Sequence, residues 1–163
     1  MERRKSYLNQ KGFSLVELII VIAIMAILVA VMVPVLIKFV EKSNVSSDYQ
    51  LADTVRGAFL CAVTDAKVIQ DPASQTYIDR LTDGTGIDVD SDSAFLGSGC
   101  LMLTSAQEIV GIPLAQLPAQ IKSAHGSSHF NVQVINGDVV VKITNTDSTG
   151  KKNIAAGNDI VVE

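Results

Sequence analysis

The pattern of hydrophobic and polar positions begins with an uncharged apolar run. The run covers 20 residues, from Leu18 to Ile37. A helix of that length rises about 30 Å, which is the thickness of the hydrocarbon core of a bilayer. Pro34 removes one backbone donor near the end of the run, and we expect it to bend the helix rather than end it. The run therefore predicts a membrane-spanning helix with a kink at Pro34.

The helical pattern continues beyond the apolar run. From residue 45 to residue 66, apolar residues recur at spacings of three and four, which indicates one face of an amphipathic helix. This pattern places Tyr49 on the apolar face and Asp48 on the polar face. We expect one helix from residue 13 to residue 67, with 13–37 in the membrane and 38–67 as an amphipathic continuation that packs on a globular domain.

The remaining residues, 68–163, are predicted to form that globular domain. Asn136-Gly137 separates two β-rich runs and is a strong signal for a two-residue turn, so we predict a β-hairpin over residues 130–143. Residues 160–162 are expected to add a third strand. Short helices, with a weaker pattern, are expected over residues 73–81, 105–110 and 114–124. The pattern thus predicts an α+β fold, a long helix on a small antiparallel sheet.

Composition and charge agree with a membrane-anchored protein. The 163 residues are enough for about one domain, and 48% are hydrophobic, with a mean hydropathy of +0.34, which excludes a disordered chain. Residues 1–12 contain four basic residues and one acidic residue, whereas the rest contains nine basic and 16 acidic residues. Basic residues mark the cytoplasmic side of a span, so we predict an amino terminus inside and a body outside. The acidic body argues against nucleic-acid binding.

The apolar run also has two ordinary explanations. A secretory signal peptide has the same basic start, but its apolar core is shorter, about 7–15 residues, and usually ends at an Ala-x-Ala site. This run is longer, has no Ala-x-Ala, and is preceded by the charged Glu17. A signal anchor for an unrelated outer domain stays open on length alone. Glu17 itself has a simple explanation, since a carboxylate is favourable at a helix amino terminus.

The residues around Glu17 carry a resemblance to a known family. Residues 11–17 read Lys-Gly-Phe-Ser-Leu-Val-Glu, and the apolar run with Pro34 follows them. This arrangement resembles the leader junction of type IV prepilins and type II secretion pseudopilins. The resemblance covers about 30 residues, 11–40, and nothing beyond. Ser14 is a small departure, because threonine is common there in the family.

The resemblance implies how the junction is processed. Prepilin peptidase would cut between Gly12 and Phe13, which makes residues 1–12 a cytoplasmic leader peptide. The same enzyme would N-methylate the new amino terminus on Phe13. Glu17 would then pair with the terminal amine of a neighbouring subunit during assembly. Such a pair is physically reasonable, because pairing opposite charges offsets their desolvation, whereas a single buried charge is strongly unfavourable.

The resemblance also implies a fold and a function. The fold would be pilin-like, and the chain would be a structural subunit of a type IV pilus or pseudopilus, a helical homo-oligomer that forms an extracellular or cell-surface filament from the cytoplasmic membrane. The implied partners are copies of itself or related pilins, membrane lipid and, indirectly, an assembly ATPase and a membrane platform protein. The alternative is a minor pilin that acts as a membrane-anchored binding or priming module for adhesion, cargo or DNA uptake.

No enzymatic chemistry is predicted. The sequence has no G-x-S-x-G, G-x-G-x-x-G, G-x-x-x-x-G-K or C-x-x-C motif, so we expect neither an enzyme nor a cofactor. Asp88, Asp90 and Asp92 offer oxygen ligands of the kind that Ca²⁺ prefers, but they lack the glycine and distal glutamate of an EF-hand loop. A solvated acidic turn is the alternative, and we assign no metal.

Cys61 and Cys100 form a candidate disulfide, because the environment outside the membrane is oxidising. The bridge would connect the end of the long helix to the loop that follows it. Two buried thiols are the alternative, since Cys61 lies near the predicted apolar face of the helix.

Overall fold

The computed structural model describes residues 12–123, 128–144 and 160–163. The chain divides into two compact units, Met1–Val40 and Glu41–Glu163. Of the predicted leader peptide, only Gly12 lies within the described residues. Both units contain part of the first helix, α1 (Leu15–Thr64).

In the first unit, α1 is exposed throughout, from Leu15 to Val40. By length and composition it can cross a membrane. Many of its residues are β-branched and lower helix propensity slightly, but in lipid only a helix satisfies every backbone polar group within one segment. The helix continues through Pro34. It begins at Leu15, two residues later than predicted.

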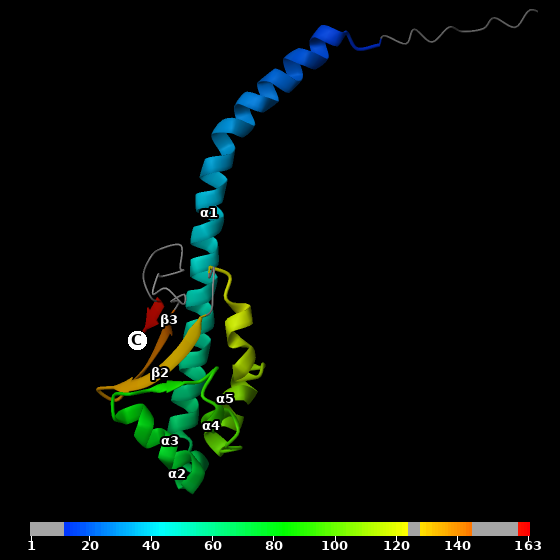
Figure 1. The fold of residues 1–163 in the computed structure, drawn as a ribbon. Helices are drawn as coiled ribbons and strands as arrows, with labels where there is room; N and C mark the ends of the chain where they lie inside the picture. Colours follow the sequence, from blue (N-terminus) through cyan, green and yellow to red (C-terminus); the bar gives the residue numbers. More distant parts are fainter. Residues whose placement is uncertain (1–11, 124–127, 145–159) are drawn as a thin grey trace, which may run out of the picture. The chain divides into compact units, whose positions relative to one another are not determined.

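The second unit contains the rest of α1 and a small sheet (Figure 1). After α1 come α2 (Ala66–Gln70), α3 (Pro72–Thr82), β1 (Ile87–Asp88), α4 (Ser93–Leu96), α5 (Leu101–Val110), the 3₁₀-helix η1 (Leu114–Gln120), β2 (His129–Ile135), β3 (Asp138–Thr144) and β4 (Ile160–Val162). The strands form one sheet in the order β1-β2-β3-β4, and every neighbouring pair is antiparallel. The predicted α+β, pilin-like fold is confirmed.

The hairpin between β2 and β3 follows directly from its two turn residues. Ile135 pairs with Asp138, and Asn136 and Gly137 between them have φ angles of 53° and 88°. Two consecutive positive φ angles define the turn type that matches the twist of paired strands, and Asn-Gly is the favoured sequence for it. The predicted hairpin is therefore confirmed, and β4 pairs with β3 as the predicted third strand.

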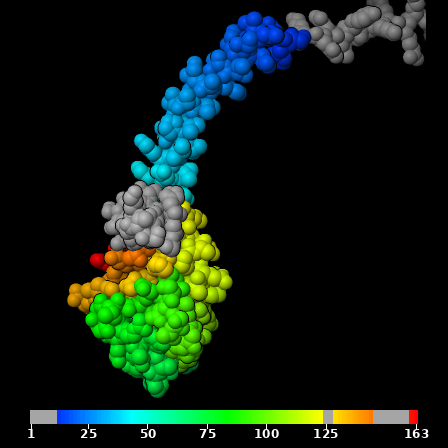
Figure 2. Space-filling model, in the orientation of Figure 1, coloured from blue at the N-terminus to red at the C-terminus, as the bar shows by residue number. Residues whose placement is uncertain are grey.

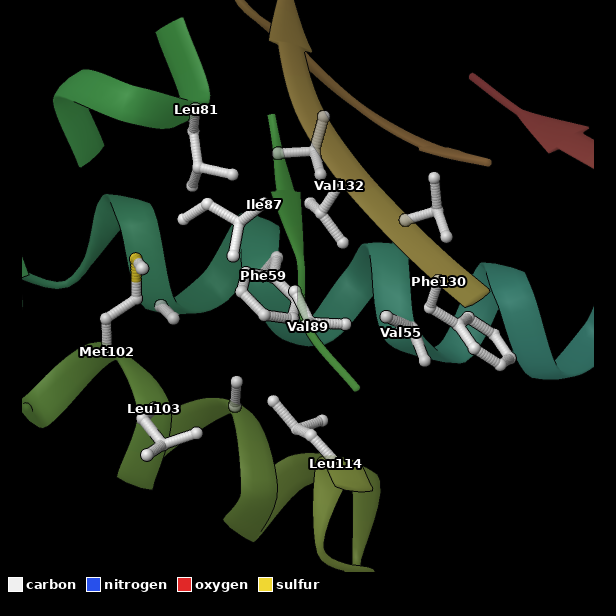
Figure 3. Close-up of a cluster of buried hydrophobic side chains, with 14 of the residues drawn as sticks. Val55, Phe59, Leu81, Ile87, Val89, Met102, Leu103, Leu114, Phe130 and Val132 are labelled. Atoms are coloured by element: carbon white, nitrogen blue, oxygen red, sulfur yellow. The ribbon is translucent and has the colours of Figure 1, made fainter. Parts of the chain in front are cut away.

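The core of the second unit lies between α1, the sheet and the helices α3, α5 and η1. Ala52, Val55, Phe59 and Ala62 of α1 are at most 1% exposed, and their spacing of three and four places them on one helix face. Figure 3 shows Val55 and Phe59 pointing into a cluster of apolar side chains from the rest of the unit. Its labelled members from other elements are Leu81, Ile87, Val89, Met102, Leu103, Leu114, Phe130 and Val132.

Several other boundaries differ from the prediction. α1 ends at Thr64 instead of residue 67, because Asp65 leaves the helical conformation and accepts a hydrogen bond from the backbone N–H of Lys67 at 2.8 Å. Aspartate is a preferred N-cap, so it starts α2 instead of prolonging α1. α5 begins four residues before the predicted residue 105. The segment from Leu114 is a 3₁₀-helix with Pro118 inside it.

Candidate functional site

The start of α1 is built by two of the residues that the sequence singles out. Ser14 is the N-cap, since its carbonyl accepts the first helical hydrogen bond from the N–H of Leu18 at 3.2 Å. The backbone N–H of Ser14 donates to Oε2 of Glu17 at 3.0 Å. This is half of a capping box, in which a glutamate three residues into the helix satisfies the N–H of the cap. Glu17 thus has a local role in starting the helix.

The residues before the cap are not helical. Gly12 and Phe13 precede α1, and the Phe13 side chain is 91% exposed. A hollow beside them is lined by Phe13, Glu17, Leu18, Ile20 and Val21. The carboxylate of Glu17 therefore lies beside an apolar surface, next to an accessible backbone segment.

The apolar run forms an unusually exposed surface. Its large side chains, from Leu18 to Ile37, are between 44% and 71% exposed. Figure 2 shows these side chains as the surface of the helix in its blue to cyan part. Soluble monomers rarely expose apolar patches of more than a few hundred Å². This surface therefore needs lipid or other protein chains around it.

A family model described as "Prokaryotic N-terminal methylation motif" matches residues 7–33. Residues 7–33 carry a prokaryotic N-terminal methylation motif. The match includes the junction at Gly12-Phe13, the capping residues Ser14 and Glu17, and most of the apolar run. The predicted resemblance to type IV prepilins is confirmed over this motif.

Curated relatives support the same assignment of the amino-terminal part. The chain is 40% identical over 62 residues to "Type IV narrow pilus major component PilA5" of Thermus thermophilus, which covers 38% of this chain and 53% of that protein. It is 47% identical over 49 residues to "Fimbrial protein EcpC" of Eikenella corrodens, covering 30% of this chain and 32% of that protein. The chain thus spans about half of the length of the Thermus protein and about a third of the length of the Eikenella protein. No solved structure matches the chain significantly.

The three aspartates of the acidic loop have separate partners. Oδ1 of Asp88 accepts from the side-chain amide of Asn131 at 2.8 Å. Asp90 accepts from the backbone N–H of Phe130 at 2.7 Å and contacts Nδ1 of His129 at 3.0 Å. No group of three metal-ligating side chains occurs among the described residues.

The third aspartate, Asp92, is the N-cap of α4. It accepts hydrogen bonds from the backbone N–H groups of Ala94 and Phe95, each at 3.0 Å. A salt bridge of 2.7 Å joins it to Arg80. The N–H of Phe95 first, and Arg80 after it, hold the pKa of Asp92 below its ordinary value. Asp88 and Asp90 thus both contact β2, whereas Asp92 connects α4 to α3.

The two cysteines are free thiols, and they differ in their surroundings. Cys61 is exposed on α1, whereas Cys100 is 2% exposed and belongs to the hydrophobic core. The candidate disulfide is not formed in this structure. The alternative of two buried thiols holds for Cys100 but not for Cys61, which is next to the buried Ala62 and is itself exposed.

Sequence reasoning also misplaced one edge of the amphipathic face. Asp48, predicted on the polar face, is 1% exposed, whereas Tyr49, predicted on the apolar face, is 45% exposed. The carboxylate of Asp48 accepts from the backbone N–H groups of Lys122 and Ser123 at 2.9 and 2.8 Å, and from the Ser123 hydroxyl. These bonds satisfy the carboxylate, so its burial is tolerated. The one signal was the spacing of Asp48 to Ala52, which continues the buried face.

A second polar contact of α1 was also missed. Nε of Arg56 donates to the carbonyl of Val139 at 2.9 Å. A terminal nitrogen of Arg56 donates to both carboxylate oxygens of Asp138, at 2.8 and 2.9 Å. The contact joins α1 to the first two residues of β3. Since 82 residues separate Arg56 from Asp138, no local pattern pointed to it.

Proposed function

We propose that the chain is a structural subunit of a type IV pilus or pseudopilus filament. Before assembly, α1 holds it in the cytoplasmic membrane, with the amino terminus inside and the body outside. The observation that carries the proposal is the apolar part of α1, which is exposed along its whole length and lies largely within a methylation motif. That surface suits lipid before assembly and the helices of neighbouring subunits afterwards.

Processing precedes assembly in this proposal. Prepilin peptidase cuts after Gly12, releases residues 1–12, and N-methylates Phe13. The geometry supports this reaction, because Gly12 and Phe13 lie outside the helix and are exposed. A peptidase binds an extended backbone, and a glycine lets that backbone come close to the enzyme because it has no side chain. The helix starts only at Leu15, so the scissile bond does not have to be unwound.

Glu17 directs assembly through its charge. Cleavage creates an ammonium group on Phe13, and the carboxylate of Glu17 pairs with the ammonium of a neighbouring subunit. Only Oε2 of Glu17 has a hydrogen bond to Ser14, and a carboxylate accepts up to about four bonds. The pair forms beside the apolar residues Leu18 and Val21. Once a neighbouring helix covers this surface in the filament, water is excluded and an unpaired charge is costly. Glu17 therefore fixes the register of an otherwise uniformly apolar contact.

The apolar area of α1 that is shielded from water changes little when the helix moves from lipid into the filament. Lipid tails are as apolar as leucine or isoleucine, so the hydrophobic effect does not drive helices together in a membrane, and close packing must do so. The work of extraction comes from a separate assembly ATPase, acting through a membrane platform protein. The name of the Thermus relative, a major pilus component, supports the major-subunit form of the proposal.

The test is mass spectrometry of the amino terminus in two fractions, membranes and filaments recovered by shearing. The proposal expects a mature chain that begins with N-methylated Phe13 in both fractions, and abundant protein in the filaments. A chain that keeps residues 1–12, or a cut after Pro34, would contradict it. A processed chain present only in trace amounts in the filaments would favour the minor pilin, a membrane-anchored binding or priming module. As a control, Gly12→Leu should leave the precursor uncut.

A further inference from the structure

Two polar contacts hold α1 to two different parts of the body. Asp48 binds the segment after η1, at Lys122 and Ser123, whereas Arg56 binds the start of β3, at Asp138 and Val139. Asp48 and Arg56 are eight residues apart, which is about 12 Å along a helix and about 80° around it. Asp48 lies on the buried face itself, whereas Arg56 lies at its edge, and the two contact different elements of the body.

The apolar contacts of α1 fix the position of the helix along its own axis less sharply than the polar contacts do. Hydrophobic burial is non-directional and depends on area, and two of the buried residues between and beside the polar contacts are small, Ala52 and Ala58. Hydrogen bonds are directional and are lost when donor and acceptor move apart by little more than 1 Å. A slide of one helical turn, about 5.4 Å, would break every bond of Asp48 and Arg56.

Asp48 also occupies a particular place along α1. It is the first buried residue of the helix, counted from its amino-terminal end, among the described residues. Contact with the body begins in the same turn, where partly buried Val45 packs against the core and Nζ of Lys122 donates to the Ser47 hydroxyl at 3.1 Å. A pull on the apolar part of α1 therefore reaches the body in this turn, and one to two turns later at the other buried residues and Arg56. The three bonds of Asp48 are the buried polar contacts of the turn at which axial load enters the body.

From these observations we infer that Asp48 and Arg56 form a register clamp, a pair of polar contacts that transmits axial force between α1 and the body. The inference rests on the proposed function, because a subunit extracted from the bilayer, or held in a filament under tension, is loaded along α1. The clamp keeps the helix and the body in one register under that load. The apolar core contributes to the stability of the body without fixing this register.

Force measurements on the full-length chain in detergent micelles test the clamp. One handle is attached at the amino terminus and the other at a cysteine introduced by Gln116→Cys, an exposed position on η1. The background carries Cys61→Ser, since Cys61 is the exposed native thiol. The variants are Asp48→Asn, which replaces one acceptor oxygen by an amide that faces N–H donors, and Arg56→Met, which keeps much of the side-chain length but no donor. Val55→Ala, a buried apolar truncation on the same helix face, is the matched control.

The two measurements to compare are the rupture force at one loading rate and the thermal midpoint. The clamp predicts that Asp48→Asn and Arg56→Met lose more rupture force than Val55→Ala does at an equal or smaller loss of thermal midpoint. Rupture forces that follow the thermal midpoint across all variants would overturn the inference, as would clamp variants with wild-type rupture force.

Arg56→Met keeps the test decisive even where Asp48→Asn does not fold. The Arg56 side chain is 21% exposed and lies at the edge of the core, so its loss leaves the apolar cluster in place. The measurement needs no filament. If the rupture forces show the clamp but the protein never enters filaments, only the proposed function is contradicted. If the protein forms normal filaments but the rupture forces show no clamp, only this inference is contradicted.

Discussion

The two parts of α1 differ in what covers their apolar side chains. Between Leu18 and Ile37, large apolar residues cover the whole helix surface and stay exposed. Between Asp48 and Ala62, a narrow stripe is buried, and the other faces are mostly polar or half-buried, with Tyr49, Leu60 and Cys61 exposed. The first part therefore depends on molecules outside the chain, lipid or other subunits, whereas the second is completed by the chain's own sheet and helices. The difference predicts which substitutions damage the body and which damage assembly.

The largest expected effect on the body comes from Phe59→Ala. Phe59 is fully buried and contacts Phe95, with ring centroids 6.3 Å apart. Truncation of a buried phenylalanine costs about 3–5 kcal/mol, which is a large part of the stability of a domain of this size. We expect a matching loss in urea unfolding of the full-length chain in detergent, with unchanged membrane insertion. Tyr49→Ala is the control, because Tyr49 is largely exposed, and a similar loss there would show that the assigned buried face is wrong.

Asp48→Ala should be the next most damaging change. It leaves the N–H of Ser123 without its acceptor in a buried site and that of Lys122 without one in a partly buried site. An unsatisfied buried donor costs about 1–3 kcal/mol, and a donor that water can reach costs less. Urea unfolding should show a total loss of roughly 2–4 kcal/mol. The neighbouring Asp53→Ala is the matched control, since Asp53 is exposed on the same helix. Equal stability of the two variants would mean that Asp48 does not hold the segment after η1.

Acid should weaken the body through its capping aspartates. The Ser74 hydroxyl first, then the N–H of Leu101, lower the pKa of Asp71, and the N–H of Phe95 has the largest such effect on Asp92. A lowered folded-state pKa contributes stability that is present above the ordinary value of 3.8 and is lost as the pH falls through the lowered pKa. The free energy of unfolding should therefore decline below about pH 4, and less steeply in Asp92→Asn. The same slope in wild type and variant would exclude Asp92 as a source.

The smallest expected effect concerns the reactivity of the two cysteines and involves no change in stability. Cys61 is exposed and Cys100 is buried, so brief alkylation of the folded protein should label Cys61 alone. Unfolding in denaturant should make Cys100 reactive as well. A disulfide in the exported protein would contradict this prediction. Alkylation would then label neither cysteine, and non-reducing peptide mapping would show one cross-linked peptide.

The sequence predicted those features that short segments determine. Asn136-Gly137 alone specifies the hairpin turn, and residues 11–17 with the apolar run carry the prepilin resemblance. The burial of Asp48 was missed because its partners lie about 75 residues away, and a carboxylate is placed on the polar face by default. β1 was missed because it has two residues and exists only through its pairing with β2. Asp65 was an available signal for the end of α1, since aspartate is a preferred N-cap.

The central claim is that the exposed part of α1 assembles with other copies and that Glu17 directs this contact. Glu17→Gln tests it most directly, because glutamine keeps a side-chain oxygen for the Ser14 N–H but has no charge. The measurement compares processed subunit in the membrane fraction with filament recovered by shearing. We predict normal insertion, cleavage after Gly12 and a folded body, with a strong loss of filament, because the pairing with a neighbour's Phe13 amine loses one of its two charges. A wild-type yield of filament would contradict the claim and leave Glu17 with only its role at the helix start.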